Sequence, residues 1–345
     1  MRLLVTGGAG FIGSHFIRHI LGRYPEYRVV NLDKLTYAGN LDNVAEVAHH
    51  PNYFFAKGTI ADPKLVNHLA AETDAIVNFA AETHVDRSIK DATPFLTTNI
   101  LGTQVLMEAA LRHKHSRFFH ISTDEVYGDS LHDRFTESSP LRPNSPYAAS
   151  KAAAEHLVAA YRRTYGLQTL VTRCSNNYGP NQYPEKLVPF FVKKLMAGEK
   201  VPVYKDGLNL RDWLHVTDHC RAIDLVLHKG KVGEVYNIGA HNEHTNLEIT
   251  QRILSILGLS EDRIEFVKDR PGHDVRYPID ATKIMTELGW KPTVDFDIGF
   301  RDTVEWYSQR FTKNIRPKLQ ITRNKIQENH KLQITRHKMK KAPSL

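Results

Sequence analysis

The sequence predicts an α/β fold in which a doubly wound parallel sheet carries a smaller α+β lobe. Two observations predict it. Up to about Tyr178, short β-rich runs alternate with amphipathic stretches, which is the pattern of βαβ units. After Tyr178 the order loosens, and helical patterns alternate with short strands and loops rich in proline and glycine. We therefore expect residues 1–178 to form the sheet domain and residues 179–311 to form the smaller lobe.

The elements follow from these runs in chain order. The strands predicted in the first region are Arg2–Thr6, Val29–Asp33, Tyr53–Lys57, Ala75–Phe79, Arg117–Ser122 and Thr169–Arg173. The clearest helices between them are Phe11–Gly22, Phe95–Lys114 and Pro146–Tyr165. In the second region the helical patterns are Leu187–Ala197, Val216–Leu227, Asn246–Leu257 and Phe296–Arg310.

Composition limits the class of protein. The chain has 345 residues, of which 41% are hydrophobic, so it is long enough for a large core. No apolar run approaches the roughly 20 residues of a membrane span, and Met1 leads directly into a strand rather than a signal peptide. Cys174 and Cys220 lie far apart without a CxxC spacing. We expect a cytoplasmic protein with buried thiols, no membrane contact and no metal site.

The basic charge is concentrated in a C-terminal tail, residues 312–345. This segment holds ten Lys or Arg and one Glu, so the other 311 residues carry −1 of the net charge of +8. It repeats the hexapeptide KLQITR at Lys318–Arg323 and Lys331–Arg336, too few copies for a solenoid. We expect a flexible, solvated extension, and the alternative is an arm that docks on nucleic acid.

A glycine-rich turn predicts a dinucleotide site and, with it, a Rossmann-type sheet. Gly7, Gly10 and Gly13 follow the first strand and open the first helix, where the backbone approaches a pyrophosphate. Asp33 ends the second strand, where a carboxylate binds the adenosine ribose hydroxyls and disfavours a 2′-phosphate. NAD is therefore favoured over NADP, although Lys34 could tolerate a phosphate. The alternative is that Asp33 only caps the following turn.

A tyrosine and a lysine one helical turn apart predict acid–base chemistry. Ser145 and Pro146 suit the start of a helix that carries Tyr147 and Lys151 on one face. A tyrosine with a pKa near 10 is a poor base at neutral pH. We expect the lysine, together with a positive nicotinamide ring, to lower that pKa.

Two adjacent carboxylates, Asp124 and Glu125, come directly after the buried run "RFFHIS". Acid pairs after a strand are usually part of a solvated loop. The carboxyl ends of strands in open α/β sheets face the ligand crevice, however, so we expect these two groups in the site.

These motifs resemble those of the extended short-chain dehydrogenase/reductases that act on nucleotide sugars, and within them the dTDP-glucose 4,6-dehydratases. The resemblance runs from Met1 to about Arg310. It rests on the GxxGxxG loop, Asp33, the Tyr147/Lys151 pair and "FAAETHVDRSI" (Phe79–Ile89), "STDEVYG" (Ser122–Gly128), "CSNNYGPNQYPEKLVP" (Cys174–Pro189), "RDWLHVTDH" (Arg211–His219) and "DRPGHDVRY" (Asp269–Tyr277).

The resemblance implies roles for the residues around the acid pair. Glu125 would be the base that removes the C5 hydrogen, and Asp124 the acid that protonates the departing C6 hydroxyl. Thr123 would bind the C4 oxygen beside Tyr147, and Lys151 would complete the catalytic set. Oxidation at C4 acidifies the C5 hydrogen, and the hydrogen removed from C4 returns to C6, so NAD is regenerated.

The resemblance also implies two binding sets. The residues expected at NAD are Gly7, Gly10, Phe11, Ile12, Gly13, Asp33, Lys34, Thr36, Thr59, Ile60, Ala80, Ala81, Thr83, Thr98, Tyr147, Lys151 and Asn177. The residues expected at the substrate are Thr83, Thr123, Asn176, Lys186, Leu187, Pro202, Tyr204, Arg211, Asn246, Asp269, Arg270 and His273. Thr59 departs from the family, which usually has Asp there to read the adenine amine. "RDWLH" could also act mostly in packing, through Trp213.

The resemblance therefore implies an NAD-dependent dTDP-glucose 4,6-dehydratase of deoxysugar biosynthesis, homodimeric through the helix pairing typical of the family. A UDP- or CDP-glucose 4,6-dehydratase is the nearest alternative. A catalytically idle NAD-binding protein whose tail docks on nucleic acid is the alternative from another class.

Overall fold

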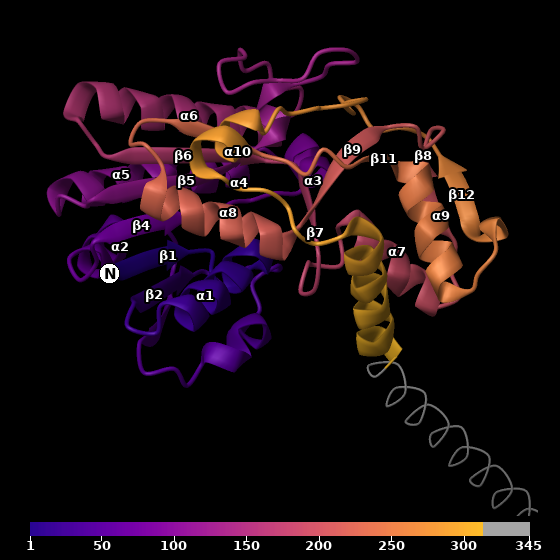
Figure 1. Ribbon diagram of the computed structural model, residues 1–345, viewed down its shortest axis with the longest axis horizontal. Helices are drawn as coiled ribbons and strands as arrows, with labels where there is room; N and C mark the ends of the chain where they lie inside the picture. Colours follow the sequence, from indigo (N-terminus) through magenta and orange to yellow (C-terminus); the bar gives the residue numbers. More distant parts are fainter. Residues whose placement is uncertain (313–345) are drawn as a thin grey trace, which may run out of the picture.

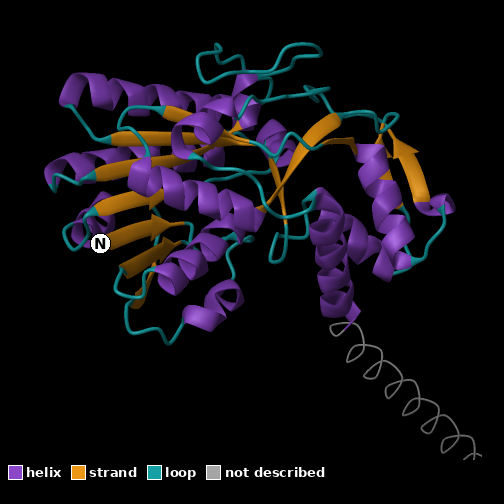
Figure 2. Ribbon diagram, in the orientation of Figure 1, coloured by secondary structure: helices purple, strands orange, loops and turns teal. Residues whose placement is uncertain are grey.

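The computed structural model describes residues 1–312, and its largest element is a sheet of seven parallel strands (Figures 1 and 2). The strands follow the order β10-β6-β5-β4-β1-β2-β3 across the sheet. Their bounds are β1 Arg2–Thr6, β2 Arg28–Asp33, β3 Tyr53–Lys57, β4 Ala75–Asn78, β5 Arg117–Thr123, β6 Thr169–Cys174 and β10 Val235–Ile238. The chain changes direction across the sheet between β1 and β4. Ligands bind beyond the carboxyl ends of strands at such a reversal.

Helices cover both faces of this sheet, because successive side chains of a strand point to opposite sides. On one face, Leu3 and Val5 pack against α1 and α8; on the other, Leu4 packs against α2, α5 and α6. The bounds are α1 Phe11–Arg23, α2 Pro63–Ala70, α5 Thr103–Arg112, α6 Pro146–Tyr165 and α8 Val216–Lys229. Figure 1 shows α1 and α8 on the same face of the sheet, and the two helices are in contact.

The smaller lobe has its own core. A three-stranded sheet has the order β11-β9-β7, and a two-stranded sheet joins β12 to β8. Its elements are β7 Asn176–Tyr178, α7 Leu187–Met196, β8 Val201–Tyr204, β9 Leu210–His215, β11 Glu243–Thr245, α9 Asn246–Leu257 and β12 Ile264–Val267. A further helix, 296–312, packs with them. Val192, Trp213, Ile253 and Phe300 are buried in this core, so Trp213 does act in packing.

Some of residues 179–311 pack on the large sheet rather than in the smaller lobe. Strand β10 pairs with β6 from Val235 opposite Val171 to Ile238 opposite Cys174. Helix α8 and helix α10, Thr282–Leu288, cover the same face as α1. The predicted boundary after Tyr178 marks only where the local alternation of strands and helices ends. The pairing of β10 with the distant β6 leaves no signal in the local sequence pattern.

The segment before α5 also differs from its prediction as one helix over Phe95–Lys114. The structure has a short helix α4, Thr93–Phe95, then a π-helical segment η2, Leu96–Gly102, and then α5. The wider π turn is held by Asn99, whose Nδ2 donates to Ser150 Oγ at 2.8 Å and to Glu82 O at 3.1 Å. Short π-helical segments often occur at functional sites, and this one places Thr98 at the cavity described below.

Helices α6 and α9 have the predicted bounds. Ser145 caps α6 by accepting a hydrogen bond from Ala148 N at 3.1 Å, and Thr245 and Glu248 form a capping box at the start of α9. Within residues 1–312 no helix is long and apolar enough to cross a membrane, and no group of His, Cys, Asp and Glu is arranged to hold a metal ion. The predicted flexible tail, 312–345, lies outside the described residues apart from Thr312.

Candidate active site

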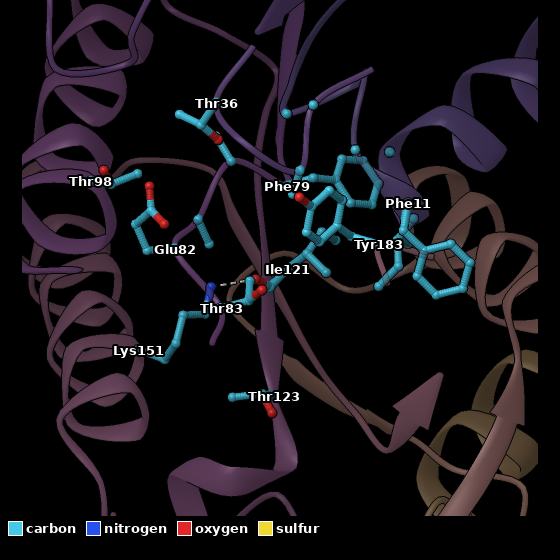
Figure 3. Close-up of a pocket in the computed structure, with 18 of the residues that line it drawn as sticks. Phe11, Thr36, Phe79, Glu82, Thr83, Thr98, Ile121, Thr123, Lys151 and Tyr183 are labelled. Carbon is cyan, nitrogen blue, oxygen red and sulfur yellow. Dashed lines mark hydrogen bonds between the residues drawn. The ribbon is translucent and has the colours of Figure 1, made fainter. Parts of the chain in front are cut away.

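A cavity of about 300 Å³ opens at the carboxyl ends of the central strands (Figure 3). All the residues predicted at NAD line it, and so do the five predicted catalytic residues, Thr123, Asp124, Glu125, Tyr147 and Lys151. Of the residues predicted at the substrate, Thr83, Thr123, Asn176 and Lys186 line the same cavity. The structure thus brings together residues from positions 7 to 186 of the chain.

The glycines leave room that no other residue would leave. Gly7 has a φ of +68°, and a Cβ on it would lie 2.7 Å from Ala80 N. A Cβ on Gly13 would lie 2.4 Å from Gly7 O. Gly10 is the N-cap of α1 and offers no side chain to the free N–H groups of the first turn. The backbone therefore forms an open anion cradle at a helix N-terminus, which suits a pyrophosphate.

Asp33 caps the following turn and also lies at the cavity. Its Oδ1 accepts a hydrogen bond from Leu35 N at 2.8 Å, so it caps the following turn, and its Oδ2 accepts one from Ala9 N at 2.9 Å. It also lines the cavity. Burial raises the pKa of Asp33, and the two N–H groups oppose that rise. Thr59 lines the cavity as well, and its hydroxyl accepts a hydrogen bond from Ala61 N at 3.2 Å.

The acid pair is not part of a solvated loop. Strand β5 ends at Thr123 and passes directly into a 3₁₀ turn, Asp124–Tyr127. Asp124 is 2% exposed; its Oδ1 accepts a hydrogen bond from the Thr123 hydroxyl at 3.2 Å, and its Oδ2 has no partner among the described residues. Burial, followed by the nearby Glu125 carboxylate, raises the pKa of Asp124 well above its ordinary value. Both effects favour the protonated form of Asp124.

Glu125 lies in a more cationic environment. Burial raises its pKa too, but the Lys186 ammonium and then the guanidinium groups of Arg270 and Arg211 lower it. Lys186 lies at the junction with the smaller lobe, where its Nζ donates to Thr83 O at 2.8 Å. Two neighbouring carboxyl groups in unequal surroundings can divide the roles of acid and base.

Tyr147 and Lys151 lie on α6 as predicted, and several neighbours act on the pKa of the phenol. Burial raises the pKa of Tyr147 well above its ordinary value, with the Glu125 carboxylate next, while a hydrogen bond with the Thr123 hydroxyl lowers it. The Lys151 ammonium donates to Ile121 O at 2.7 Å rather than to the phenol (Figure 3). The expected lowering by Lys151 is therefore not provided by a direct hydrogen bond.

The remaining predicted substrate residues lie in the smaller lobe, outside the lining of the cavity. They are Leu187, Pro202, Tyr204, Arg211, Asn246, Asp269, Arg270 and His273. Arg270 forms an ion pair with Asp86 at 3.0 Å, and Tyr204 OH donates to the same carboxylate at 3.3 Å. Next to them, His273 Nδ1 lies 2.6 Å from Asp269 Oδ1. These five residues form one polar cluster across the two lobes.

Arg211 is bound differently. Its NH2 donates to Asp274 O at 2.9 Å and its NH1 to Leu210 O at 2.6 Å, and the guanidinium lies 4.2 Å from the centre of the Tyr277 ring. At 5% exposure it is deeply buried. In this arrangement Arg211 supports the backbone near the acid pair.

The sequence reasoning missed several residues at the site. Glu82, Tyr183 and Glu185 line the cavity, and Asp86 joins the polar cluster beside it. Glu185 pairs with Arg87 at 3.1 Å, and the Arg87 guanidinium lies over the Tyr37 ring. All of these residues except Tyr37 lie inside the quoted motifs "FAAETHVDRSI" and "CSNNYGPNQYPEKLVP". Their position in these motifs was the available signal that they belong to the site.

Comparison with known proteins agrees with this geometry. The family model described as GDP-mannose 4,6 dehydratase matches residues 4–303. A dTDP-glucose 4,6-dehydratase from Streptomyces niveus is 57% identical over 311 residues, covering 89% of this chain and 93% of that protein. The low-salt glycan biosynthesis protein Agl12 of Haloferax volcanii is 54% identical over 307 residues, covering 89% of this chain and 98% of that protein.

Solved structures are similar over about 90% of the chain. The dTDP-glucose 4,6-dehydratase DesIV from Streptomyces venezuelae, crystallised with NAD bound, is 52% identical with a TM-score of 0.88, covering 90% of this chain and 97% of that one. A UDP-glucose 4-epimerase from Thermotoga maritima is 30% identical with a TM-score of 0.83, covering 90% of this chain and 99% of that one.

Proposed function

Because the chain belongs to the dTDP-glucose 4,6-dehydratase family of the extended short-chain dehydrogenase/reductases, we propose that it converts dTDP-glucose to dTDP-4-keto-6-deoxyglucose with NAD as its cofactor. One observation supports this reaction above all. A buried acid pair with unequal surroundings shares a single cavity with Tyr147 and an anion cradle. An epimerase needs only to remove and return hydrogen at one carbon, whereas loss of water needs an additional acid and base.

The residues present fit the cofactor. The cradle of Gly7, Gly10 and Gly13 would hold the pyrophosphate, Asp33 the adenosine ribose and Thr59 the adenine. When bound, NAD supplies an acceptor for the hydrogen removed from C4 and returns it to C6. Lys34 is exposed beside Asp33, so the preference for NAD over NADP rests on the carboxylate.

Tyr147 and Thr123 act at C4 in this proposal. Tyr147 takes the proton of the C4 hydroxyl, and the Thr123 hydroxyl, which lies beside the phenol, binds the C4 oxygen. Because burial raises the pKa of Tyr147, the phenol needs positive charge in the cavity to lose its own proton and so act as a base. The site thus favours proton transfer from C4 once a cationic cofactor is bound.

Glu125 and Asp124 act at C5 and C6. Glu125, whose pKa is raised by burial against the opposing effect of three cations, removes the C5 proton that the C4 ketone has acidified. Asp124, held protonated by burial, donates its proton to the departing C6 hydroxyl, so water leaves without forming hydroxide. The unpartnered Oδ2 of Asp124 supports this donor role, because no other described residue competes for it.

The smaller lobe binds the nucleotide in this proposal. Lys186, Arg270 and Arg211 are cations of that lobe whose charge acts on Glu125, and a diphosphate needs such partners. Tyr204, Asp269 and His273 lie with Arg270 in the polar cluster and would hold the base. Thr83 and Asn176 in the cavity, and Leu187, Pro202, Arg211 and Asn246 in the smaller lobe, complete the proposed set.

We also propose that the protein is a cytoplasmic homodimer that does not bind nucleic acid. Leu96 and Leu101 are 48% and 57% exposed and lie one π turn apart on η2, which supports a dimer face beside α5 and α6. Two buried free thiols, Cys174 and Cys220, support a reducing compartment. The charge of −1 outside the tail gives the body of the protein no attraction for a polyanion.

The test is an assay of the purified protein with dTDP-glucose, UDP-glucose, CDP-glucose and GDP-mannose. We expect a 4-keto product, followed by its alkaline absorbance, with dTDP-glucose turned over fastest. Substrate deuterated at C4 should carry the label to C6 without dilution by solvent, and the product made in D₂O should gain deuterium at C5. Return of the label to C4 with inverted configuration would show an epimerase, and turnover of GDP-mannose alone would contradict the proposed substrate.

A further inference from the structure

His120 lies on β5, three residues before the catalytic Thr123, and has no role in the mechanism above. It is 1% exposed and does not line the cavity. Its Nε2 lies 3.3 Å from Lys151 Nζ, and its Nδ1 lies 3.3 Å from Asn78 Nδ2. The ring therefore joins the lysine of the active site to the centre of the parallel sheet.

The lysine ammonium has three N–H groups to place. One donates to Ile121 O at 2.7 Å, and a second faces His120 Nε2. Among the described residues the third has no partner, and Lys151 lines the cavity. Two fixed contacts thus leave one N–H for a ligand, and His120 is the only side chain of the described residues that supplies one of these contacts.

We propose that His120 is a positioning residue for Lys151: its neutral imidazole accepts a hydrogen bond from the ammonium and so fixes where the charge of Lys151 lies. The consequence for Tyr147 rests on the function proposed above, but the contact itself does not. Removing the acceptor would leave a buried ammonium short of a partner and free to move away from the cavity wall.

This role requires one particular tautomer. A neutral imidazole has one donor and one acceptor, so a ring that accepts at Nε2 carries its proton on Nδ1. Nδ1–H then needs an acceptor. Asn78 provides one when its amide oxygen, rather than its amide nitrogen, faces the ring. Both orientations of the amide fit the same space, because they have the same shape. The other neighbours of that amide are the hydroxyls of Thr6 and Thr103, which can donate or accept.

The tautomer is also coupled to the charge of the lysine. A neutral Lys151 amine would accept from Nε2–H, and the Asn78 amide would then donate to Nδ1, which is the orientation with its Nδ2 facing the ring. Burial lowers the pKa of Lys151 to about 8, opposed by Glu155 on α6 and Cys174 on β6. Burial and then Lys151 hold the pKa of His120 well below its ordinary value, which favours the neutral ring.

The first test uses the protein without cofactor or substrate, so it does not depend on the proposed reaction. Protein labelled with ¹⁵N-histidine is titrated from about pH 5 to 9 and followed by long-range ¹⁵N–¹H spectra. The His120 ring is assigned by nuclear Overhauser contacts to the Asn78 amide. We expect Nδ1–H at low pH, a change to Nε2–H near the lysine pKa, and no imidazolium. An Nε2–H ring at every pH, or one that titrates near pH 6.5, would overturn the proposal.

The second test compares His120→Gln with His120→Leu. Gln offers an amide oxygen as acceptor, and Leu offers none. In His120→Leu the Lys151 ammonium loses one hydrogen bond and can move away from the cavity wall, so the pKa of Tyr147 should rise. The rising limb of kcat against pH should therefore move upward by about one unit, and the KM for dTDP-glucose should stay unchanged. His120→Gln should restore most of the profile.

A matched control separates this effect from packing. His115 is also buried, at 4% exposure, and its Nε2 hydrogen bonds to Ala70 O, away from Lys151. His115→Leu should lower the Tm without moving the pH profile. If His120→Leu behaves in the same way, or if Gln rescues nothing, His120 is only a core residue. An inactive wild type would instead refute the proposed function and leave the tautomer test standing.

Discussion

Asp124 and Glu125 are neighbours in the chain, yet their carboxyl groups meet different surroundings. Asp124 is almost fully buried and faces the Glu125 charge, whereas Lys186 and two guanidinium groups act on Glu125. The difference comes from the 3₁₀ turn that follows β5, which directs adjacent side chains to different neighbours. This turn thus gives the two carboxyl groups the unequal surroundings that the proposed division of roles requires.

The division of roles predicts that substitutions separate the half-reactions. Glu125→Gln should still allow oxidation at C4 but block loss of the C5 proton, so C5 of bound substrate should not exchange with D₂O. Asp124→Asn should slow release of water by about 10²–10⁴-fold while C5 exchange continues, because the base is intact. Mass spectrometry of recovered sugar nucleotide measures the exchange. Exchange lost in Asp124→Asn and kept in Glu125→Gln would reverse the assignment.

Thr59 gives a second prediction at this scale. Thr59→Asp should tighten NAD binding by up to about tenfold, since one charge-assisted hydrogen bond contributes roughly 1 kcal/mol net. Calorimetric titration of NAD measures the change, and Thr59→Asn is the neutral control. Weaker binding in the Asp variant would show that the adenine is read elsewhere.

Single residues were predictable where a motif ties them to a ligand. The glycines, Asp33 and the acid pair belong to motifs whose chemistry can be stated without a structure. Asp86 and His120 lie in the same quoted segments, but their contacts are with Arg270 and Lys151, distant in sequence. No local pattern reveals such a partner, so these contacts emerge only from the fold.

At the scale of elements, helices α1 and α8 are joined by a buried charge cluster. Asp224 on α8 lies 2.9 Å from His19 Nε2 on α1 and 2.8 Å from His228 Nδ1. Hydrogen bonding to Asp224 raises the pKa of His228. Burial alone would raise the pKa of Asp224, but hydrogen bonds from the two histidines hold it below its ordinary value. Tyr24 also donates to this carboxylate, at 3.2 Å, and Arg23 lies 3.5 Å from it.

This cluster predicts a pH-dependent stability. The pKa of His228 is raised in the folded state, so its contribution to the free energy of unfolding is complete below the ordinary histidine pKa of about 6.5. That contribution is lost as the pH rises through the pKa of the folded state. The depressed pKa of Asp224 means that its contribution is present above about pH 4 and is lost below it. Between these limits we expect the cluster to add about 0.5–1 kcal/mol to the free energy of unfolding. The value is small because His228 is partly exposed.

Thermal unfolding from about pH 5 to 8 tests this, with His228→Gln as the comparison. The difference in Tm between wild type and variant should shrink as pH rises. His68 is exposed on α2, on the opposite face of the sheet, and takes no part in the cluster. His68→Gln is therefore the control, for which the difference in Tm should stay constant. A constant difference for His228→Gln would contradict the cluster.

Regular elements were predictable to within a residue or two, because their apolar periodicity and caps are local. Helix α6 begins and ends where Ser145, Pro146 and Gly166 predict. The π turn of η2 was not predictable, because the Asn99 contacts that hold it are made with Glu82 and Ser150, which are distant in sequence. Strand β10 shows the same limit, because only its pairing with β6 reveals its place.

At the scale of the whole molecule, the exposed leucines of η2 predict how two copies associate. Leu101→Glu should convert a dimer into a monomer, because a charge would be buried at the proposed face. Leu208 is 56% exposed in the smaller lobe, so Leu208→Glu is a matched control that should leave the dimer intact. Light scattering coupled to gel filtration measures the mass. Dissociation by Leu208→Glu alone would move the interface to the smaller lobe.

The path of the chain between the two lobes has a consequence for how the protein is made. The edge strand β10 and helices α8 and α10 of the large sheet are translated after the first segments of the smaller lobe. While a ribosome is still synthesising the polypeptide, the nascent sheet therefore exposes the edge of β6 and the apolar surface that α8 later covers. A truncated product that stops at Tyr178 would keep both surfaces open, and we expect it to need a chaperone rather than to persist as an independent NAD-binding unit.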